Sequence, residues 1–237
     1  MLLSMPDAPT TARARARVLL TEDIKATARR QLGEVGAAGL SLRAVARELG
    51  MVSSAVYRYF ESRDALLTAL IVESFDAVGA AAEQAVAALP RDLQPRWRAL
   101  AGGVRRWALD NPHDYALVYG SPVPGYQAPT DTITPAARVS LVMLSIVADG
   151  VERGQIDTSA TASIPRAVRA DVVALREFVG PAVSDEVLLR TLLVWTGLFG
   201  AISYELFGHL HGVIEDYDAF FDHQMRRWGA YLAGGHH

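Results

Sequence analysis

A short aromatic and basic stretch, residues 53–59, carries the clearest chemistry in the sequence. Tyr57, Arg58 and Tyr59 follow two serines, an alanine and a valine within one run. Arginine can pair with guanine or bind a phosphate, tyrosine hydroxyls can donate to phosphates, and small residues allow close approach to base edges. The pattern predicts contact with duplex DNA. The alternative is that the tyrosines are partly buried rings of a helical bundle and that Arg58 is a solvated surface charge.

The elements that must present this stretch read as helices joined by tight turns. Apolar residues recur at three- and four-residue steps from Thr21 until Gly36 ends the pattern. Ser41 can cap a second helix that Gly50 closes, and a third helix of about six or seven residues follows. Helix, tight turn and short helix is the layout of a helix-turn-helix, whose second helix enters the major groove.

The composition is that of a folded protein with limited chemistry. Hydrophobic residues make up 51% of the 237 positions, and there is no cysteine, which excludes disulfides, thiolate metal sites and cysteine nucleophiles. The start of the chain lacks the continuous apolar stretch of a secretory signal, and we expect no charge-free run of about 18 apolar residues. These features predict a soluble, cytoplasmic protein.

Charge is distributed unevenly along the chain. Residues 1–62 carry nine Arg or Lys against six Asp or Glu, whereas the whole chain has a formal net charge of −3. A basic front and an acidic rear suggest that only the front meets a polyanion.

The rest of the chain also has helical periodicity, and we expect an all-α fold. The stretch "SPVPGYQAPTD", with three prolines, is expected to be an ordered surface loop. A short helix is expected from Asn111. The longer helices are expected at 94–110, 135–153, 166–179, 185–210 and 216–232.

Small, apolar and aromatic residues in the first 70 positions follow a family spacing. Residues 26–67 resemble the DNA-binding domain of the tetracycline-repressor (TetR) family of transcriptional regulators. One departure is Val52, which stands where the family usually has a hydroxyl residue, so we expect the helix cap to move to Ser53. The matching positions are Ala28, Leu32, Gly36, Ser41, Ala46, Gly50, Val56, Tyr57, Arg58, Tyr59, Phe60, Arg63, Leu66 and Leu67.

The resemblance implies a domain plan and a set of DNA contacts. It implies an N-terminal arm at 1–20, a three-helix helix-turn-helix domain at 21–66, and a helical ligand-binding and dimerisation domain at 67–237. The residues expected at DNA are Thr21, Arg43, Ser53, Ser54, Ala55, Tyr57, Arg58, Tyr59 and Arg63.

The arm itself alternates arginine with alanine. Arg13, Arg15 and Arg17 have the form of an arm that could lie along an adjacent minor groove. The alternative is an ordinary solvated tail.

The second domain is expected to form a homodimer and to bind a small molecule. The stretch 191–210 is apolar on almost all sides and carries three glycines, so burial between subunits is expected; burial within one subunit is the alternative. Trp195 to Gly200 resembles the Trp-His-Gly (WHG) subgroup signature, with Phe199 in place of its histidine. The candidate ligand contacts are Trp107, Tyr115, Tyr119, Phe178, Trp195 and Phe199.

No metal, cofactor or catalytic site is expected. His209 and His211 are two residues apart and diverge on a helix, and no nucleophile elbow, phosphate loop or zinc-protease motif is present. The expected function is a repressor that binds a palindromic operator as a dimer and is released by a small apolar or aromatic ligand. The alternatives are a DNA-binding regulator without an effector, an activator, and an all-helical enzyme or interaction module that does not bind DNA.

Overall fold

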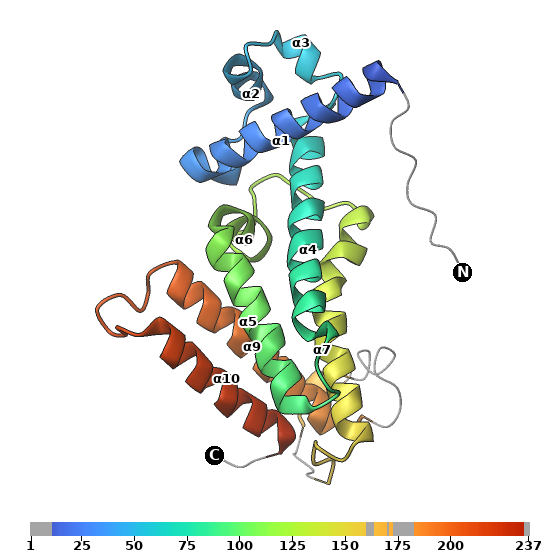
Figure 1. Ribbon diagram of the computed structural model, residues 1–237, viewed down its shortest axis with the longest axis vertical. Coiled ribbons are helices and arrows are strands. Elements are labelled where there is room, and N and C mark those ends of the chain that lie inside the picture. The colour runs from blue at the N-terminus through green and yellow to red at the C-terminus, as the bar shows by residue number, and fades with distance from the viewer. Residues whose placement is uncertain (1–10, 160–163, 170, 173–182, 235–237) are drawn as a thin grey trace. The chain divides into compact units, whose positions relative to one another are not determined.

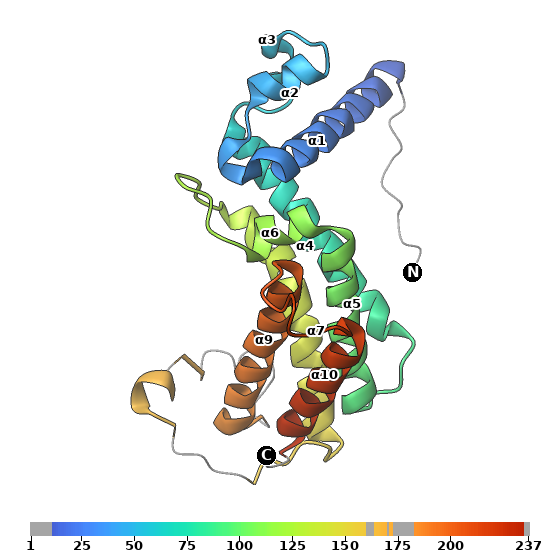
Figure 2. The same cartoon turned by 90° about the vertical axis from the view of Figure 1, so that its left-hand side faces the viewer.

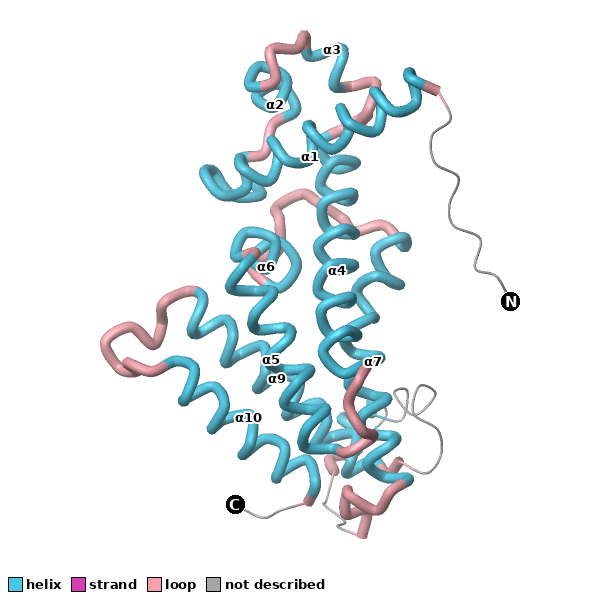
Figure 3. The backbone as a smooth tube through the Cα atoms, viewed as in Figure 1, coloured by secondary structure: helices cyan, strands magenta, loops and turns pink. Residues whose placement is uncertain are grey.

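The computed structural model describes residues 11–159, 164–169, 171–172 and 183–234, and over this part of the chain it is all-helical, without strands (Figures 1 and 3). This confirms the expected fold class. The elements are α1 (Ala12–Gly39), α2 (Leu42–Glu48), α3 (Ser53–Val56), α4 (Arg63–Ala87), α5 (Leu93–Asp110), α6 (Pro112–Tyr119), the 3₁₀ turn η1 (Thr130–Thr132), α7 (Ile133–Glu152), α9 (Asp185–Leu206) and α10 (Tyr217–Ala233).

The chain forms two compact units. The first combines the residues up to Glu73 with His113–Thr132, and the second combines Ser74–Pro112 with the residues from Ile133 onward. Helix α4 therefore contributes to both units. The segment 113–132, which the sequence assigned to the second domain, packs with the helix-turn-helix, whereas the predicted functional division at residue 66 stays a prediction.

The first unit is built around one apolar face of α1. Ile24, Ala28 and Leu32 recur at four-residue steps and are buried, together with Val45 of α2 and Phe60 after α3. Gly36 takes the left-handed backbone conformation, with φ of 69°, and interrupts the helix where the sequence predicted its end.

Helix α5 is the centre of the second unit. Its residues Trp97, Leu100, Val104 and Trp107 lie on one face and are buried against α7, α9 and α10. The indole Nε1 of Trp97 donates to the carbonyl of Met225 on α10 at 2.7 Å, so the largest buried ring also has its polar atom satisfied.

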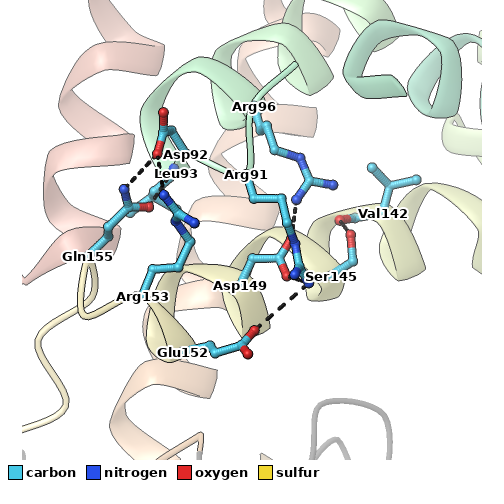
Figure 4. Close-up of polar contacts among 10 residues, drawn as sticks. All are labelled: Arg91, Asp92, Leu93, Arg96, Val142, Ser145, Asp149, Glu152, Arg153 and Gln155. Atoms are coloured by element: carbon cyan, nitrogen blue, oxygen red, sulfur yellow. Dashed lines mark hydrogen bonds and ion pairs between the residues drawn. The ribbon is translucent and has the colours of Figure 1, made fainter. Parts of the chain in front are cut away.

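A buried carboxylate fastens the start of α5 to the end of α7. Asp149 is 8% exposed and accepts hydrogen bonds from Arg91 and Arg96, one on each carboxylate oxygen (Figure 4). Burial opposes the ionisation of Asp149, but the two guanidinium groups outweigh it and lower its pKa. We name this group of three residues the Asp149 clasp.

The predicted helices agree with the structure except at several boundaries. Helix α1 begins at Ala12 rather than at Thr21, so Glu22 and Asp23 lie inside the helix and not in its first turn (Figure 2). Helix α9 ends at Leu206, four residues before the predicted end. Of the predicted helix 166–179, residues 166–169 and 171–172 are helical and the remainder lies outside the described residues.

Three stretches combine length with an apolar composition. Helix α4, the segment Thr130–Glu152 and α9 are long and apolar enough, by length and composition alone, to cross a membrane. The expectation from the sequence concerned runs free of charge, whereas these helices carry few charges within a long apolar window. Between 39% and 44% of those windows is buried inside the structure, where apolar residues pack between helices. The apolar composition is therefore not evidence of a membrane span.

Candidate nucleic-acid interface

The helix-turn-helix is positioned by a glycine turn and a shared core. Gly50 has φ of 66°, a conformation that favours glycine, and the amide of Met51 donates to the carbonyl of Ala46 at 2.8 Å across the turn. Val45 on α2 and Val56 on α3 are both fully buried. The two short helices are therefore held at a fixed angle, as a helix-turn-helix requires.

Helix α3 begins without a side-chain cap. Val52 is the N-cap residue, with extended backbone, and Ser53 is already helical. The expectation that the cap moves to Ser53 is therefore wrong. The regular helix is also shorter than predicted, because it ends at Val56 and continues as hydrogen-bonded turns through Tyr59.

We expect Val52→Ser to stabilise the protein, because a serine at the N-cap can accept a hydrogen bond from an amide of the first turn. The free energy of unfolding should rise by up to about 1 kcal/mol, measured by denaturant titration. Val213→Ser is the matched control, since Val213 is similarly exposed in the loop before α10 and caps no helix. An equal or smaller effect at Val52 than at Val213 would contradict the capping argument.

One face of α3 and the turn that follows it points to solvent. Tyr57 is 45% exposed, and Ser54 and Arg58 are exposed beside it. Arg43 is exposed near the start of α2, and the exposed Arg47 near the end of α2 adds a cation that was not among the residues expected at DNA. Hydroxyls and guanidinium groups thus gather on the helix pair that a helix-turn-helix presents to DNA.

Other predicted DNA contacts have different surroundings. Ala55 is 8% exposed, so the expectation that it faces outward is wrong: it lies on the inner face of α3. Ser53 is half-buried, and Thr21 lies inside α1, where its hydroxyl donates to the carbonyl of Arg17 at 2.9 Å. Tyr59 is half-buried against the core, with its ring beneath the Arg17 guanidinium.

Arg63 has a structural role that the sequence did not reveal. Its Nη2 donates to the carbonyl oxygens of Ala37 and Ala38, at 2.7 and 3.3 Å, and its Nη1 lies 3.4 Å from the carboxylate of Asp64. The side chain thus ties the beginning of α4 to the end of α1. Its predicted phosphate contact would have to share the guanidinium with these carbonyls.

Segment 113–132 is joined to the helix-turn-helix by polar contacts. Asp114 on α6 accepts from Arg29 of α1 at 3.3 Å, and Arg29 also pairs with Glu73 at 2.7 Å. Tyr126 and Thr68 share a hydrogen bond of 2.9 Å between their hydroxyls. A movement of this segment would therefore act directly on α1 and on the start of α4.

The candidate ligand contacts do not form one site. Trp107 borders a cavity between α4 and α5, and Trp195 borders another between α7 and α9. Phe199 packs against Trp195 at a tilted angle, with 4.7 Å between ring centroids. Tyr115 is fully buried and contacts Tyr119 in the first unit, where burial raises the pKa of Tyr119. Phe178 lies outside the described residues. Of the six candidates, Trp195 alone is among the described residues that line the apolar cavity between α7 and α9.

Fold and exposed face together define a helix-turn-helix protein of the kind that regulates transcription, and comparison with known proteins identifies the family. The sequence profile described as "Bacterial regulatory proteins, tetR family" matches residues 24–70, and that described as "Tetracyclin repressor-like, C-terminal domain" matches residues 97–228. This chain belongs to the TetR family, whose members are transcriptional regulators and not enzymes.

Sequence similarity to known proteins extends over nearly the whole chain. The HTH-type transcriptional regulators Rv1816 of Mycobacterium tuberculosis and Mb1846 of Mycobacterium bovis are each 42% identical over 228 residues, which cover 92% of this chain and 94% of theirs. The crystal structure of the regulatory protein SCO4313 is 32% identical, with a TM-score of 0.74, and the match covers 92% of this chain and 98% of that one. The resemblance seen in the sequence is confirmed, whereas the Trp-His-Gly subgroup stays a prediction.

Proposed function

We propose that this protein is a cytoplasmic, ligand-responsive repressor that binds a palindromic operator as a homodimer. The observation that carries the proposal is the exposed face formed by α3 and the turn after it, where Tyr57 and Arg58 lie above a buried scaffold. An arginine at this position can reach a guanine edge or a phosphate, and a tyrosine hydroxyl can donate to a phosphate.

The homodimer is supported by an unusual face on α9. Five residues at three- and four-residue steps are exposed there, although most of them are apolar or small. They are Leu193, Thr196, Gly200, Tyr204 and Phe207. Such a stripe is typical of a helix that is covered by another subunit. With the neighbouring α10 it would form a four-helix interface between two copies. We call these five residues the α9 stripe.

The ligand is supported by a cavity of about 320 Å³ between α7 and α9. Among its described lining residues are Leu141, Met143, Leu188 and Trp195, and none of them is charged. A site of this size and composition fits a small apolar or aromatic molecule.

Two hydroxyl groups are the main polar features of this cavity. Ser140 donates to the carbonyl of Ala137 at 2.8 Å, and Thr191 donates to the carbonyl of Val187 at 2.7 Å. Both hydrogens are thus engaged, and each oxygen can only accept. The preferred ligand is therefore uncharged, with at most a hydrogen-bond donor or two.

The proposed mechanism is a shift between two dimer arrangements. Recognition helices of a dimer fit successive major grooves when they are about 34–36 Å apart. A ligand that binds better to an arrangement with another spacing releases the operator, and couplings of this kind are typically about 1–3 kcal/mol. Helix α4, which belongs to both compact units, and segment 113–132 are the elements through which the change would pass.

The proposal is tested by binding to duplex DNA from just upstream of the protein's own gene, at two salt concentrations and against scrambled competitor. We expect tight, salt-dependent and sequence-selective binding. Uncharged apolar compounds are then titrated into the complex, and release by one of them is expected. Failure of every compound would favour a regulator without an effector, and failure to bind any sequence selected from a random library would overturn the regulatory role.

Arg58→Ala is expected to weaken operator binding and to relax the sequence preference at one position of each half-site, because Arg58 is exposed on the recognition face. Loss of a bidentate base contact costs about 1–3 kcal/mol. The measurement is competition between the operator and single-base variants. Uniform weakening with an unchanged preference would show that Arg58 binds phosphate and reads no base.

A further inference from the structure

The first turns of α1 extend beyond the helix-turn-helix core as a basic helix. Residues 12–21 contain Arg13, Arg15 and Arg17 and no acidic residue, and the nearest carboxylate along α1 is Glu22. We infer that this extension is a second DNA-binding surface, which grips the phosphates beside the major groove that α3 enters. The inference rests on the proposed function and adds to it a surface outside the recognition helix.

The extension is held as a helix from its first residue. Thr11 is the N-cap, and its hydroxyl oxygen accepts from the amide of Ala14 at 3.2 Å. Alanine and arginine both favour helix strongly, and the segment continues without a break into the buried part of α1. The arginines are therefore carried on a helix that is continuous with the folded part of α1, and not on a separate N-terminal arm as the sequence suggested.

Contact with the recognition element fixes which side of α1 faces DNA. The guanidinium carbon of Arg17 lies 5.6 Å from the centroid of the Tyr59 ring, the residue expected at a phosphate after α3. Figures 1 and 2 both place the N-terminal end of α1 at the same end of this unit as α2 and α3. Arg17 therefore lies on the side from which α3 would approach a duplex.

Helical spacing separates the three arginines. Arg13 is four residues before Arg17 and shares its face, whereas Arg15 is two residues from each and points to the other side. All three are outside the core, and no ion pair of Arg13, Arg15 or Arg17 is found within residues 11–159 and the other described segments. Arg13 and Arg17 thus place two positive charges on the same face of α1, beside α3.

The width of DNA grooves decides what this helix can touch. An α-helix with its side chains is about 10–12 Å across, whereas the minor groove of B-DNA is about 6 Å wide. The extension cannot enter the minor groove as an extended arm would. Its arginines can reach the phosphates at the groove edges, and such contacts do not depend on sequence.

The test compares the double variant Arg13→Ala/Arg17→Ala with Arg15→Ala and with the wild-type protein. Each is titrated with the operator selected from a random-sequence library and with a scrambled duplex, at salt concentrations from about 50 to 200 mM. We expect the double variant to bind both duplexes more weakly. The salt slope, which is the slope of log affinity against log salt concentration, should become less steep by about one unit for each phosphate contact removed. Over that salt range each lost contact reduces the change in affinity about three- to fourfold.

Arg15→Ala is the charge control on the same helix. It should keep nearly the full slope, because its side chain points away from the duplex. Equal slopes for the double variant and for Arg15→Ala would overturn the second surface while leaving the proposed function intact. A wild-type protein that binds no duplex would overturn both.

A second variant tests the helical form. Ala14→Gly/Ala16→Gly keeps every arginine but lowers the helix propensity of the extension. We expect it to lose salt slope in the same direction as the double arginine variant. Wild-type slope in the glycine variant, or a loss confined to duplexes with A·T-rich flanks in the arginine variant, would indicate a flexible minor-groove arm and overturn the inference.

Discussion

Gly200→Glu is expected to produce a monomer that no longer binds operator DNA tightly. Gly200 is exposed in the middle of the α9 stripe, and a Cβ placed on it meets no heavy atom within 4 Å in the described structure. The folded subunit therefore has room for the new side chain, and glutamate favours a helix more than glycine does. In the proposed dimer the same position is buried, and two unpaired carboxylates there would cost about 3 kcal/mol or more.

The measurement is the molar mass in solution by analytical ultracentrifugation, together with the operator affinity. A cost of this size corresponds to a loss of roughly 100-fold or more in dimerisation, and a monomer can occupy only one half-site. Gly102→Glu is the matched control, since Gly102 lies in α5, away from the stripe, and also has no heavy atom within 4 Å of its Cβ position. A Gly200→Glu protein that remains a dimer with normal affinity would show that the α9 stripe is not the interface.

Asp149→Asn is expected to cause a large loss of stability. The carboxylate of Asp149 is the shared acceptor for Arg91 and Arg96, and the Arg96 side chain is only 12% exposed. Asparagine cannot compensate two guanidinium groups, so Arg96 would remain buried without a counter-charge. We expect the free energy of unfolding to fall by about 3 kcal/mol at pH 7, measured by denaturant titration.

The loss of stability caused by Asp149→Asn should depend on pH. The pKa of Asp149 is lowered in the folded protein, so the clasp stabilises fully above the unfolded pKa of about 3.9. This stabilisation is lost as the pH falls through the lower, folded pKa. The difference in unfolding free energy between the wild-type protein and the Asp149→Asn variant should therefore be constant near neutral pH and should approach zero in acid.

Glu152→Gln is the control for this prediction. Glu152 lies on the same helix as Asp149, but its side chain is 70% exposed and lies 3.9 Å from Arg91. Exposed pairs of this kind contribute about 0–1 kcal/mol, so little change is expected. A difference for Asp149→Asn that does not vary with pH would show that the loss comes from altered packing and not from the charge of the clasp.

Much of the fold could be predicted because its causes are local. Gly36 and Gly50 mark positions where the backbone needs positive φ, and the four-residue spacing of Ile24, Ala28 and Leu32 places the core face of α1. The recognition stretch could be predicted for the same reason, because residues that are adjacent in sequence stay adjacent on a short helix and in the turn that follows it. Tyr57 and Arg58 are accordingly found exposed, as the sequence suggested.

The sequence did not reveal contacts whose partners lie in distant parts of the chain. Arg63 is directed to carbonyl groups 25 and 26 residues earlier, and the partners of Asp149 lie 58 and 53 residues before it. The candidate ligand aromatics share a residue type but belong to different cavities and units. Composition and periodicity carry no information about such pairings.

The sequence by itself determined the helical class, the helix-turn-helix and the residue types on its recognition face, since helix periodicity, turn glycines and short motifs act over a few residues. Only the tertiary structure decided that Ala55 is buried and that segment 113–132 packs with the DNA-binding unit. These outcomes depend on which surfaces exclude water together, and burial is a property of the folded chain as a whole.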